Sequence, residues 1–384
     1  MYNFEFRNPV KILFGEGKIG FIVKEIPVGS RILLTYGGGS IFKNGVYDQV
    51  VKALQHFTLI EFGGIEPNPR YATLMKAVKI VKSENIDFLL AVGGGSVVDG
   101  TKFIAAAANF PGDAWDICSK GAPIESAMPF GVVLTLSATG TEMNPFSVVS
   151  NAATNEKLPF GSPWVYPKFS VLDPNVLKSL PKTQLANGVI DAFVHVLEQY
   201  LTFPNQAEIQ DRFAEAVLLS LLQYGPDYVF KEFDYDVASN TMWAATMALN
   251  GQLALGVPTD WATHTIGHEL TALYGLDHAQ SLAVVLPGMM EVMRTEKHEK
   301  LLRYAKNVWN LSEEHDEITI DQAIVKTEEF FQNLETKTHL SEYNIPEAGI
   351  EIIIEKLKKQ GKIHLGERKA LDENRLRALL QMRY

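Results

Sequence analysis

The sequence predicts an α/β fold built on a parallel sheet in its first part and an all-helical fold in its second part. Two observations support this prediction. Short β-branched runs alternate with helical periods up to about residue 180, which is typical of a parallel sheet covered by helices on both faces. After Pro181 these runs largely disappear, and long amphipathic segments take their place. We therefore expect two domains, residues 1–180 and residues 181–384.

The elements of the first domain follow from periodicity and from turn residues. A continuous apolar run such as FLLAV (88–92) is typical of a strand buried on both faces. Asn68 followed by Pro69 predicts a helix start, because asparagine caps helices and proline fits their first position. The expected order is a strand at 31–36, a helix at 41–57, a strand at 59–62, a helix from Pro69, a strand at 88–92 and a helix at 101–109.

The second domain is predicted from amphipathic periods, in which apolar residues recur every three or four positions. We find no internal repeat, low-complexity tract or flexible linker between these segments. The segments expected to be helical include 183–201, 207–224, 237–254 and 297–310.

Composition limits the classes of partner. The 384 residues carry a formal net charge of −10, which argues against nucleic-acid or anionic-membrane partners because both attract concentrated Lys and Arg. Cys118 is the single cysteine, so an intramolecular disulfide and a multi-cysteine zinc site are excluded. The start of the chain lacks a signal-peptide pattern, and no run of about eighteen apolar residues could span a bilayer. We expect a soluble, cytoplasmic protein.

A glycine-rich loop joins the expected strand at 88–92 to the helix that follows it. Glycines without a Cβ let backbone N–H groups approach a pyrophosphate closely, and a helix N-terminus adds partial positive charge. Ser96 and Asp99 also form an S-x-x-D pair that is typical of a capped helix start. The alternative interpretation is a tight turn without a ligand, because the pattern matches neither GxGxxG nor a Walker A loop.

An earlier glycine run, YGGGSIFKNG (36–45), follows the expected strand at 31–36; it is the first glycine run along the chain, and the loop after residue 92 is the second. In dinucleotide sites an acidic residue near such a strand end commonly binds the ribose 2′-hydroxyl. Residues 36–47 contain no Asp or Glu, whereas Ser40 and Lys43 are available for a 2′-phosphate. We therefore favour NADP(H) over NAD(H). The alternative is a flexible turn in which Lys43 is merely solvated.

A third polar loop, LTLSATGTEMN (134–144), follows another expected strand. Hydroxyl side chains at the carboxyl end of a parallel strand lie where ligands of such sheets bind. Runs of Ser and Thr also occur in turns that bind nothing. The hydroxyl residues of this loop are Thr135, Ser137, Thr139 and Thr141.

Two segments of the helical domain carry possible metal ligands. Asp191 and His195 are four residues apart on an expected helix, so both side chains lie on one face. His264 and His268 repeat this spacing, and Tyr274-Gly275 indicates that their helix ends before His278. A carboxylate with two or three imidazoles suits a divalent cation such as Zn²⁺ or Fe²⁺. Spacing alone leaves open which histidines bind, and Asp191 with His195 could instead be a buried polar pair.

Together these stretches resemble the iron-activated (group III) alcohol dehydrogenases, and within them the butanol dehydrogenase and YqhD-like aldehyde reductase branch. The resemblance extends over most of the chain. The matching stretches are LTYGGGSIFKNGVYDQV, FGGIEPNP, LLAVGGGSVVDGTKFIAAAAN, LTLSATGTEMN, VLDP, ANGVIDAFVHVLEQY, MWAATMALNG and DWATHTIGHELTALYGLDHAQSLAVVLP.

The resemblance implies a Rossmann-like dinucleotide-binding domain and a helical metal-binding, catalytic domain, in a dehydroquinate synthase-like architecture with a cleft between them. It implies one metal ion, zinc or iron, held by Asp191, His195, His264 and His278. It leaves His268 near the nicotinamide as a residue that does not bind the metal. It also implies a homodimer.

The resemblance further implies which residues bind the cofactor. The first glycine run would accommodate the NADP 2′-phosphate, the second would bind the pyrophosphate, and the hydroxyl loop would line the nicotinamide. Lys157 matches a lysine that reaches the cofactor ribose. The implied cofactor-binding residues are Gly37, Gly38, Gly39, Ser40, Gly93, Gly94, Gly95, Ser96, Asp99, Thr135, Ser137, Thr141 and Lys157.

The expected function is therefore reversible, metal-dependent hydride transfer between NADP(H) and primary alcohols or aldehydes. His268 is our candidate proton donor, since imidazole titrates near neutrality. At Pro145-Phe146 the chain departs from the small residues of the branch, so we expect Phe146 to narrow the substrate pocket.

Three alternatives remain. One is an NAD(H)-dependent member of the same family, and another is a non-enzymatic, metal-stabilised dinucleotide sensor. The third is a dehydroquinate-synthase-like lyase, which needs Arg and Lys around its phosphorylated substrate. The segments 134–146, 186–200 and 260–280 contain neither Arg nor Lys, which argues against the lyase.

Overall fold

The computed structural model describes residues 1–384 and divides the chain into two compact units. The α/β unit comprises Arg7–Leu180, and the helical unit comprises Met1–Phe6 with Pro181–Tyr384. The sequence predicts the first six residues to be part of the α/β domain. They belong instead with the helical unit, because the N–H of Tyr2 donates to the carbonyl of Gly256 at 2.8 Å.

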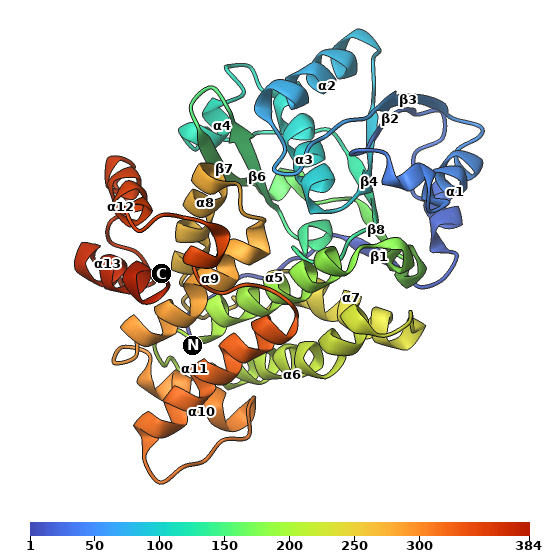
Figure 1. Cartoon of the computed structure of the whole chain (residues 1–384). Helices are drawn as coiled ribbons and strands as arrows, with labels where there is room; N and C mark the ends of the chain where they lie inside the picture. Colours follow the sequence, from blue (N-terminus) through green and yellow to red (C-terminus); the bar gives the residue numbers. More distant parts are fainter. The chain divides into compact units, whose positions relative to one another are not determined.

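The α/β unit is built on one six-stranded parallel sheet with the strand order β1-β8-β5-β4-β2-β3 (Figure 1). Every residue of β4, β5 and β8 is buried, which explains why these strands are unbroken apolar runs in the sequence. The strands are β1 (Lys11–Phe14), β2 (Arg31–Thr35), β3 (Thr58–Phe62), β4 (Phe88–Gly93), β5 (Phe130–Leu134) and β8 (Phe169–Leu172).

The direction in which successive strands are added to this sheet reverses at one point. From β2 the chain adds β3 on one side, and from β4 it adds β5 and then β8 on the other side. The neighbours β2 and β4 therefore flank a topological switch point, and ligands of open α/β sheets bind outside the carboxyl ends of such strands. Both glycine runs begin at these two carboxyl ends.

Helices and one hairpin complete the α/β unit. Helices α2 and α3 pack side by side, and α3 also packs on β4 and β5 (Figure 1). The hairpin β6–β7 is antiparallel and packs on α3. The elements are α1 (Val46–Ala53), α2 (Tyr71–Ser83), α3 (Gly95–Asn109), α4 (Asp116–Ser119), β6 (Phe146–Asn151) and β7 (Glu156–Gly161), with 3-10 helices η1 (Lys18–Lys24), η2 (Ser40–Phe42), η3 (Thr141–Met143), η4 (Pro163–Val165) and η5 (Pro174–Ser179).

Two expected helix boundaries in this unit are wrong. The segment 41–57 holds only η2 and α1, because Gly45 takes the left-handed conformation (φ 76°) and separates them. Helix α2 starts at Tyr71, not at Pro69. Asn68 has φ 55° and the carbonyl of Pro69 accepts the N–H of Ser150 at 2.9 Å, so this stretch is held as a loop.

The helical unit is organised around α5, which packs against α6, α7 and α9 (Figure 1). Every residue from Gly188 to Tyr200 is buried, so α5 is enclosed on all sides. The helices are α5 (Lys182–Tyr200), α6 (Glu208–Phe230), α7 (Tyr235–Ala248), α8 (Ala262–Tyr274), α9 (His278–Val292), α10 (His298–Asn307), α11 (Asp316–Asn333), α12 (Gly349–Lys359) and α13 (Glu373–Met382), with the 3-10 helix η6 (Ser341–Tyr343).

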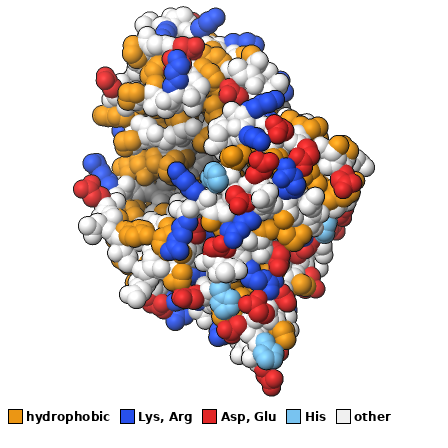
Figure 2. Space-filling view, turned by 90° about the vertical axis from the view of Figure 1, so that its left-hand side faces the viewer, with side chains coloured by type: hydrophobic (Ala, Val, Ile, Leu, Met, Phe, Trp, Pro, Cys, Tyr) orange, Lys and Arg blue, Asp and Glu red, His pale blue; other side chains and the backbone are white.

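Acidic and basic side chains are interspersed over the face shown in Figure 2, in agreement with 45 acidic and 35 basic residues in the chain. None of the helices is both long and apolar enough to cross a lipid bilayer.

Candidate metal centre and dinucleotide-binding loops

Three imidazole rings surround one carboxylate oxygen in the helical unit. Asp191 Oδ1 lies 3.6 Å from His195 Nδ1, 3.9 Å from His264 Nε2 and 3.6 Å from His278 Nε2. Ligand atoms of Asp191, His195 and His264 fall within 4.8 Å of one another, and all three residues are buried. Four side chains from three helices therefore converge on one small volume.

Local structure explains the convergence. Asp191 and His195 are one turn apart on the enclosed helix α5. Helix α8 ends at Gly275, which has φ 73°, so the chain turns between His264 and His278 as the sequence predicted. Asp277 then forms a capping box with Gln280, which fixes His278 as the first residue of α9.

The donor set and its spacing fit a divalent cation of the zinc or iron kind. Ligands at zinc distances of about 2.0 to 2.2 Å around a tetrahedral centre lie roughly 3.3 Å from each other, close to the observed separations. These separations are too long for hydrogen bonds, and the buried Nδ1 of His195 has none. Burial lowers the pKa of His195 to about 4, against the opposing effect of Asp191, so its imidazole is neutral and can donate a lone pair at neutral pH.

Glu198 is a member of this site that the sequence analysis missed. It lies one turn after His195 on α5, is buried, and pairs with Nδ1 of His264. The backbone N–H groups of Thr263 (2.7 Å) and His264 (3.4 Å) also donate to this carboxylate. Burial raises the pKa of Glu198 well above its usual range, while these N–H groups and Lys297 act in the opposite direction. The sequence does contain one signal for Glu198: it lies seven residues after Asp191, a spacing that places both on the same face of a helix.

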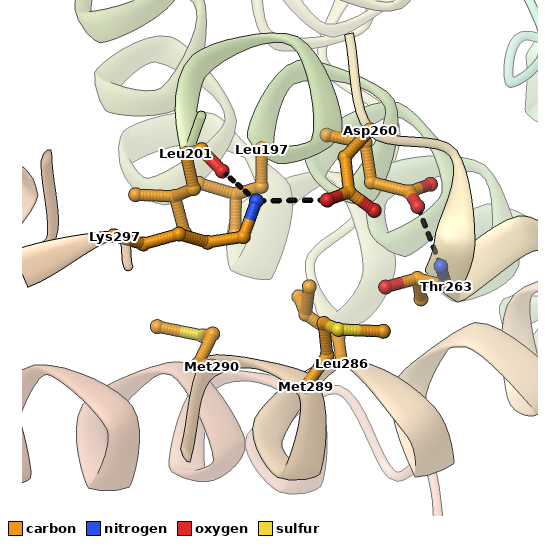
Figure 3. Close-up of a pocket in the computed structure, with 9 residues that line it drawn as sticks. Leu197, Leu201, Asp260, Thr263, Leu286, Met289, Met290 and Lys297 are labelled. Carbon is orange, nitrogen blue, oxygen red and sulfur yellow. Dashed lines mark hydrogen bonds and ion pairs between the residues drawn. The ribbon is translucent and has the colours of Figure 1, made fainter. Parts of the chain in front are cut away.

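A second buried layer lies behind Glu198. Lys297 Nζ donates to the carbonyl of Leu201 at 2.6 Å and to Asp260 Oδ2 at 2.8 Å (Figure 3). It also donates to both oxygens of Glu367 at 3.1 Å. In Figure 3, Lys297, Asp260 and Thr263 lie around a small pocket that Leu286, Met289 and Met290 close from below. The volume of this pocket is about 10 Å³.

His268 lies beside the carboxylate-imidazole group but outside it. Its ring centroid is 5.3 Å from that of His278 and 6.3 Å from that of His264, and the side chain is half-buried. Trp261 adds an aromatic wall, with its ring centroid 5.4 Å from that of His264.

In the α/β unit, the second glycine run forms the tight connection from β4 to α3. A Cβ on Gly93 would lie 2.6 Å from the Val97 side chain, and one on Gly95 would lie 2.9 Å from Thr139 Oγ1. These glycines are therefore required by packing within the protein. The same absence of side chains leaves the first N–H groups of α3 open to an anion.

The expected capping pair of Ser96 and Asp99 is wrong. Gly94 is the N-cap of α3, and Ser96 Oγ accepts the N–H of Asn68 at 3.3 Å instead. Asp99 accepts the hydroxyl of Thr141 at 2.6 Å and the N–H of Val148 at 2.9 Å. Asp99 and Thr141 thus connect α3 to the hydroxyl loop. Their polar groups are used in hydrogen bonds within the protein.

Lys102 reinforces that connection and was also missed. Its buried ammonium donates to Thr141 Oγ1 (2.7 Å), to the carbonyl (2.9 Å) and Oδ1 (3.0 Å) of Asn144, and to the carbonyl of Phe146 (2.7 Å). Burial lowers the pKa of Lys102 to about 8, against the opposing charges of Asp99 and Glu142.

The other expected cofactor residues are spread around the same strand ends. Thr135 and Ser137 are buried, and the N–H of Thr135 donates to the carbonyl of Gly93 at 3.0 Å. Lys157 pairs with Ser150 across the β6–β7 hairpin. Burial raises the pKa of Asp99, and the charges of Lys102 and Lys157 act in the opposite direction. Gly37, Gly38 and Gly39 with the exposed Ser40 follow β2 directly.

One carboxylate near the first glycine run was overlooked because it lies on the neighbouring strand. Glu61 on β3 accepts the hydroxyls of Tyr36 at 3.1 Å and Tyr47 at 2.6 Å. The rings of both tyrosines pack against Phe42, with centroids 5.3 and 4.5 Å away. Glu61 is thus held beside the turn that carries Ser40 and Lys43.

Comparison with known proteins decides the family. Residues 9–174 match the iron-containing alcohol dehydrogenases, and residues 185–384 match the C-terminal part of the Fe-containing alcohol dehydrogenase family. The chain belongs to the iron-containing alcohol dehydrogenase family. It is therefore an NAD(P)-dependent oxidoreductase that acts on alcohols or aldehydes, and family membership implies a divalent metal.

Individual members of the iron-containing alcohol dehydrogenases are similar over nearly the whole chain. The NADPH-dependent aldehyde reductase YqhD of Escherichia coli (strain K12) is 54% identical over 370 residues, 96% of each chain. The NADH-dependent butanol dehydrogenase A of Clostridium acetobutylicum is 40% identical over 358 residues, 92% of each chain. The crystal structure of YqhD superposes with a TM-score of 0.98 at 51% identity, covering 100% of this chain and 99% of that one.

This family membership confirms the enzyme class expected from the sequence, together with the Rossmann-like and helical architecture. The lyase alternative is not supported by it. Phe146, which was expected to narrow the substrate pocket, begins β6 with 48% of its surface exposed. Its ring packs on Gly161, where a Cβ would lie 2.8 Å from it.

Proposed function

We propose that this iron-containing alcohol dehydrogenase interconverts primary aldehydes and alcohols with NADP(H), using one zinc or iron ion held by Asp191, His195, His264 and His278. The observation that carries the proposal is the placement of three imidazole nitrogens 3.6 to 3.9 Å from Asp191 Oδ1. When bound, the cation supplies Lewis acidity to the carbonyl oxygen, and the nicotinamide supplies the hydride.

The chain's own residues would divide the remaining tasks. The N–H groups at the start of α3 bind the pyrophosphate, because Gly93, Gly94 and Gly95 leave them uncovered. Ser40 and Lys43 bind the 2′-phosphate of NADP. The nearby Glu61 acts against that phosphate, so we propose a preference for NADPH over NADH that is limited rather than absolute.

His268 would supply the proton that an aldehyde oxygen takes up on reduction. Its place beside His264 and His278, together with its partial exposure, supports a path from solvent. Replacing His268 by Phe should lower turnover and remove one ionisation from the pH profile. Wild-type turnover with an unaltered profile would exclude this role.

The substrates we propose are apolar aldehydes of medium length, and Trp261 beside His264 supports this choice. Phe146→Ala is expected to widen the tolerated chain length, as measured by kcat/KM over a series of aldehydes. An unchanged profile would contradict a role for Phe146 in substrate choice.

We also propose that the enzyme is a homodimer. The N-terminal segment presents Tyr2, Phe4 and Phe6, each about half exposed, at alternate positions, as a strand does on its apolar face. Sedimentation velocity on the full chain should give twice the monomer mass, and a monomer at micromolar concentration would contradict the proposal.

The experiment that tests the proposed function measures initial rates with butanal on protein stripped of metal and then reloaded with Zn²⁺ or Fe²⁺. Oxidation of NADPH should require the metal and exceed oxidation of NADH. Activity that survives stripping would show that the four residues do not hold a catalytic cation, and equal rates with both cofactors would contradict the NADP preference.

A further inference from the structure

We propose that Glu198 is a positioning residue of the cation site: it holds the imidazole of His264 so that Nε2 is directed at Asp191, and thereby sets the affinity and geometry of the site. This inference rests on the proposed function, because it takes His264 as a ligand of the ion. Glu198 itself does not belong to the four proposed ligands.

The two ring nitrogens of His264 face different partners. A neutral imidazole carries one proton, and the nitrogen without it donates the lone pair. Glu198 Oε2 contacts Nδ1 of His264, while Nε2 of the same ring faces Asp191 Oδ1 at 3.9 Å. A carboxylate acceptor at Nδ1 holds the proton there, which leaves the Nε2 lone pair for the ion.

Glu198 also fixes the backbone that carries His264. Trp261, the N-cap residue of α8, provides no side-chain hydrogen bond and has φ 62°. Glu198 takes over this function, since its Oε1 accepts the N–H of Thr263 and that of His264. A carboxylate at a helix N-terminus is favoured by the helix dipole. The same side chain therefore positions both the ring and the helix turn that carries it.

The helix that carries Glu198 is a rigid support. Glu198 shares the enclosed helix α5 with Asp191 and His195, so a single rigid element carries two ligands and the partner of a third. The backbone carbonyl of Glu198 accepts the N–H of Asp260 at 2.9 Å, which adds a second connection to the start of α8.

The buried layer behind Glu198 holds this arrangement from the other side. Asp260 accepts from Lys297 at 2.8 Å and from the N–H of Ala262 at 2.8 Å, so one carboxylate connects α8 to the residue before α10 (Figure 3). Only a cavity of about 10 Å³ separates the groups of this layer, which leaves little room for the Glu198 side chain to turn away.

The test is Glu198→Gln, which keeps the size of the side chain but removes its charge and one of its two acceptor oxygens. Loss of a partner of a metal-binding histidine typically weakens metal binding by about 10 to 100-fold. We expect a decrease in Zn²⁺ affinity in this range, measured by competition with a chromophoric chelator. The d–d absorption bands of the Co²⁺-loaded protein should also shift, because the orientation of His264 changes.

Glu215→Gln is the matched control. Glu215 is equally buried in the same unit and accepts hydrogen bonds from Tyr200 (3.0 Å), Arg303 (2.6 Å) and Asn307 (2.8 Å), none of which is a proposed ligand. This variant should lose thermal stability as Glu198→Gln does, while its Zn²⁺ affinity and Co²⁺ spectrum remain those of the wild type.

The outcomes separate this inference from the proposed function. A wild-type chain that does not bind Zn²⁺ or Co²⁺ refutes both. A wild type that binds, with Glu198→Gln within twofold of its affinity and identical in spectrum, refutes the positioning role alone. If Glu198→Gln does not fold, Glu198→Asp decides by the same criterion, because it retains the charge but withdraws the carboxylate from His264 by one methylene.

Discussion

The proposed cation site and the glycine loops use polar side chains in opposite ways. In the helical unit, Asp191 and the three histidines direct their ring and carboxylate atoms at a common point, and the groups around them support that direction. In the α/β unit, the polar groups of Asp99, Thr141 and Ser96 are bonded to the protein itself. The first site consists of side-chain groups. The second consists of backbone loops whose conformation is held by side-chain hydrogen bonds.

This difference predicts different consequences of mutation. A change at the cation site should remove chemistry and leave the fold largely intact, because the four residues gain little from one another without the ion. A change at the glycine loops should reduce stability and cofactor binding together, because the same hydrogen bonds serve both. The three predictions below test this distinction, from the largest expected effect to the smallest.

His195→Ala should have the largest effect on catalysis. We expect kcat/KM to fall by about 10³-fold or more, because Lewis-acid stabilisation contributes several kcal/mol and each 1.36 kcal/mol is a factor of ten. Metal content measured by atomic emission should fall with it. His298→Ala is the control, since that half-exposed imidazole contacts only Glu317 among the acidic groups. Full activity of His195→Ala would contradict the proposal that the helical unit supplies the chemistry.

Lys102→Met should reduce the stability of the α/β unit. Removing a buried ammonium and leaving its acceptors unpaired costs about 3 to 5 kcal/mol, and hydrogen exchange of residues 134–146 should accelerate accordingly. The KM for NADPH should rise while the metal content stays unchanged. Lys76→Met on the exposed face of α2 serves as the control, with an expected change within about 0.5 kcal/mol. Loss of metal from Lys102→Met alone would contradict the separation of roles.

Glu61→Gln should have the smallest effect and should concern specificity alone. Removing one exposed charge near the proposed 2′-phosphate site should increase the NADPH to NADH ratio of kcat/KM by roughly two- to fivefold, the equivalent of about 0.4 to 1 kcal/mol. Raising the salt concentration should reduce the difference. Glu84→Gln is the control, because Glu84 is an exposed carboxylate that forms an ion pair with Arg31. A ratio that falls or stays constant would show that Glu61 does not face the phosphate.

The sequence predicted the side-chain site better than the backbone site. Helical spacing placed Asp191 with His195, and Gly275 separated His264 from His278, because periodicity and helix-ending glycines are local signals. The expected cap at Ser96 and the helix start at Pro69 were wrong, because Asn68 and Ser96 bond to each other across 28 positions. Local pattern cannot anticipate such a tertiary contact.

Three functional residues could not be predicted from the sequence for the same reason. Lys102, Glu198 and Glu61 act on partners that are 39, 66 and 25 positions away in sequence. Each lies in an ordinary helix or strand, where a charged residue signals nothing by itself. Only tertiary packing gives these residues a role: α3 packs on η3 and β6, β3 pairs with β2, and Glu198 on α5 meets the start of α8.

The four proposed ligands differ in access to solvent, and this has a kinetic consequence. The side chain of His278 is 26% exposed, against 10% for His264, 5% for His195 and 4% for Asp191. If these four residues hold the ion as proposed, its exchange should begin with the release of His278 at the start of α9. The rate of demetallation then depends on how often the short connection Gly275–Asp277 opens, so a chelator would remove the ion at a rate independent of its own concentration.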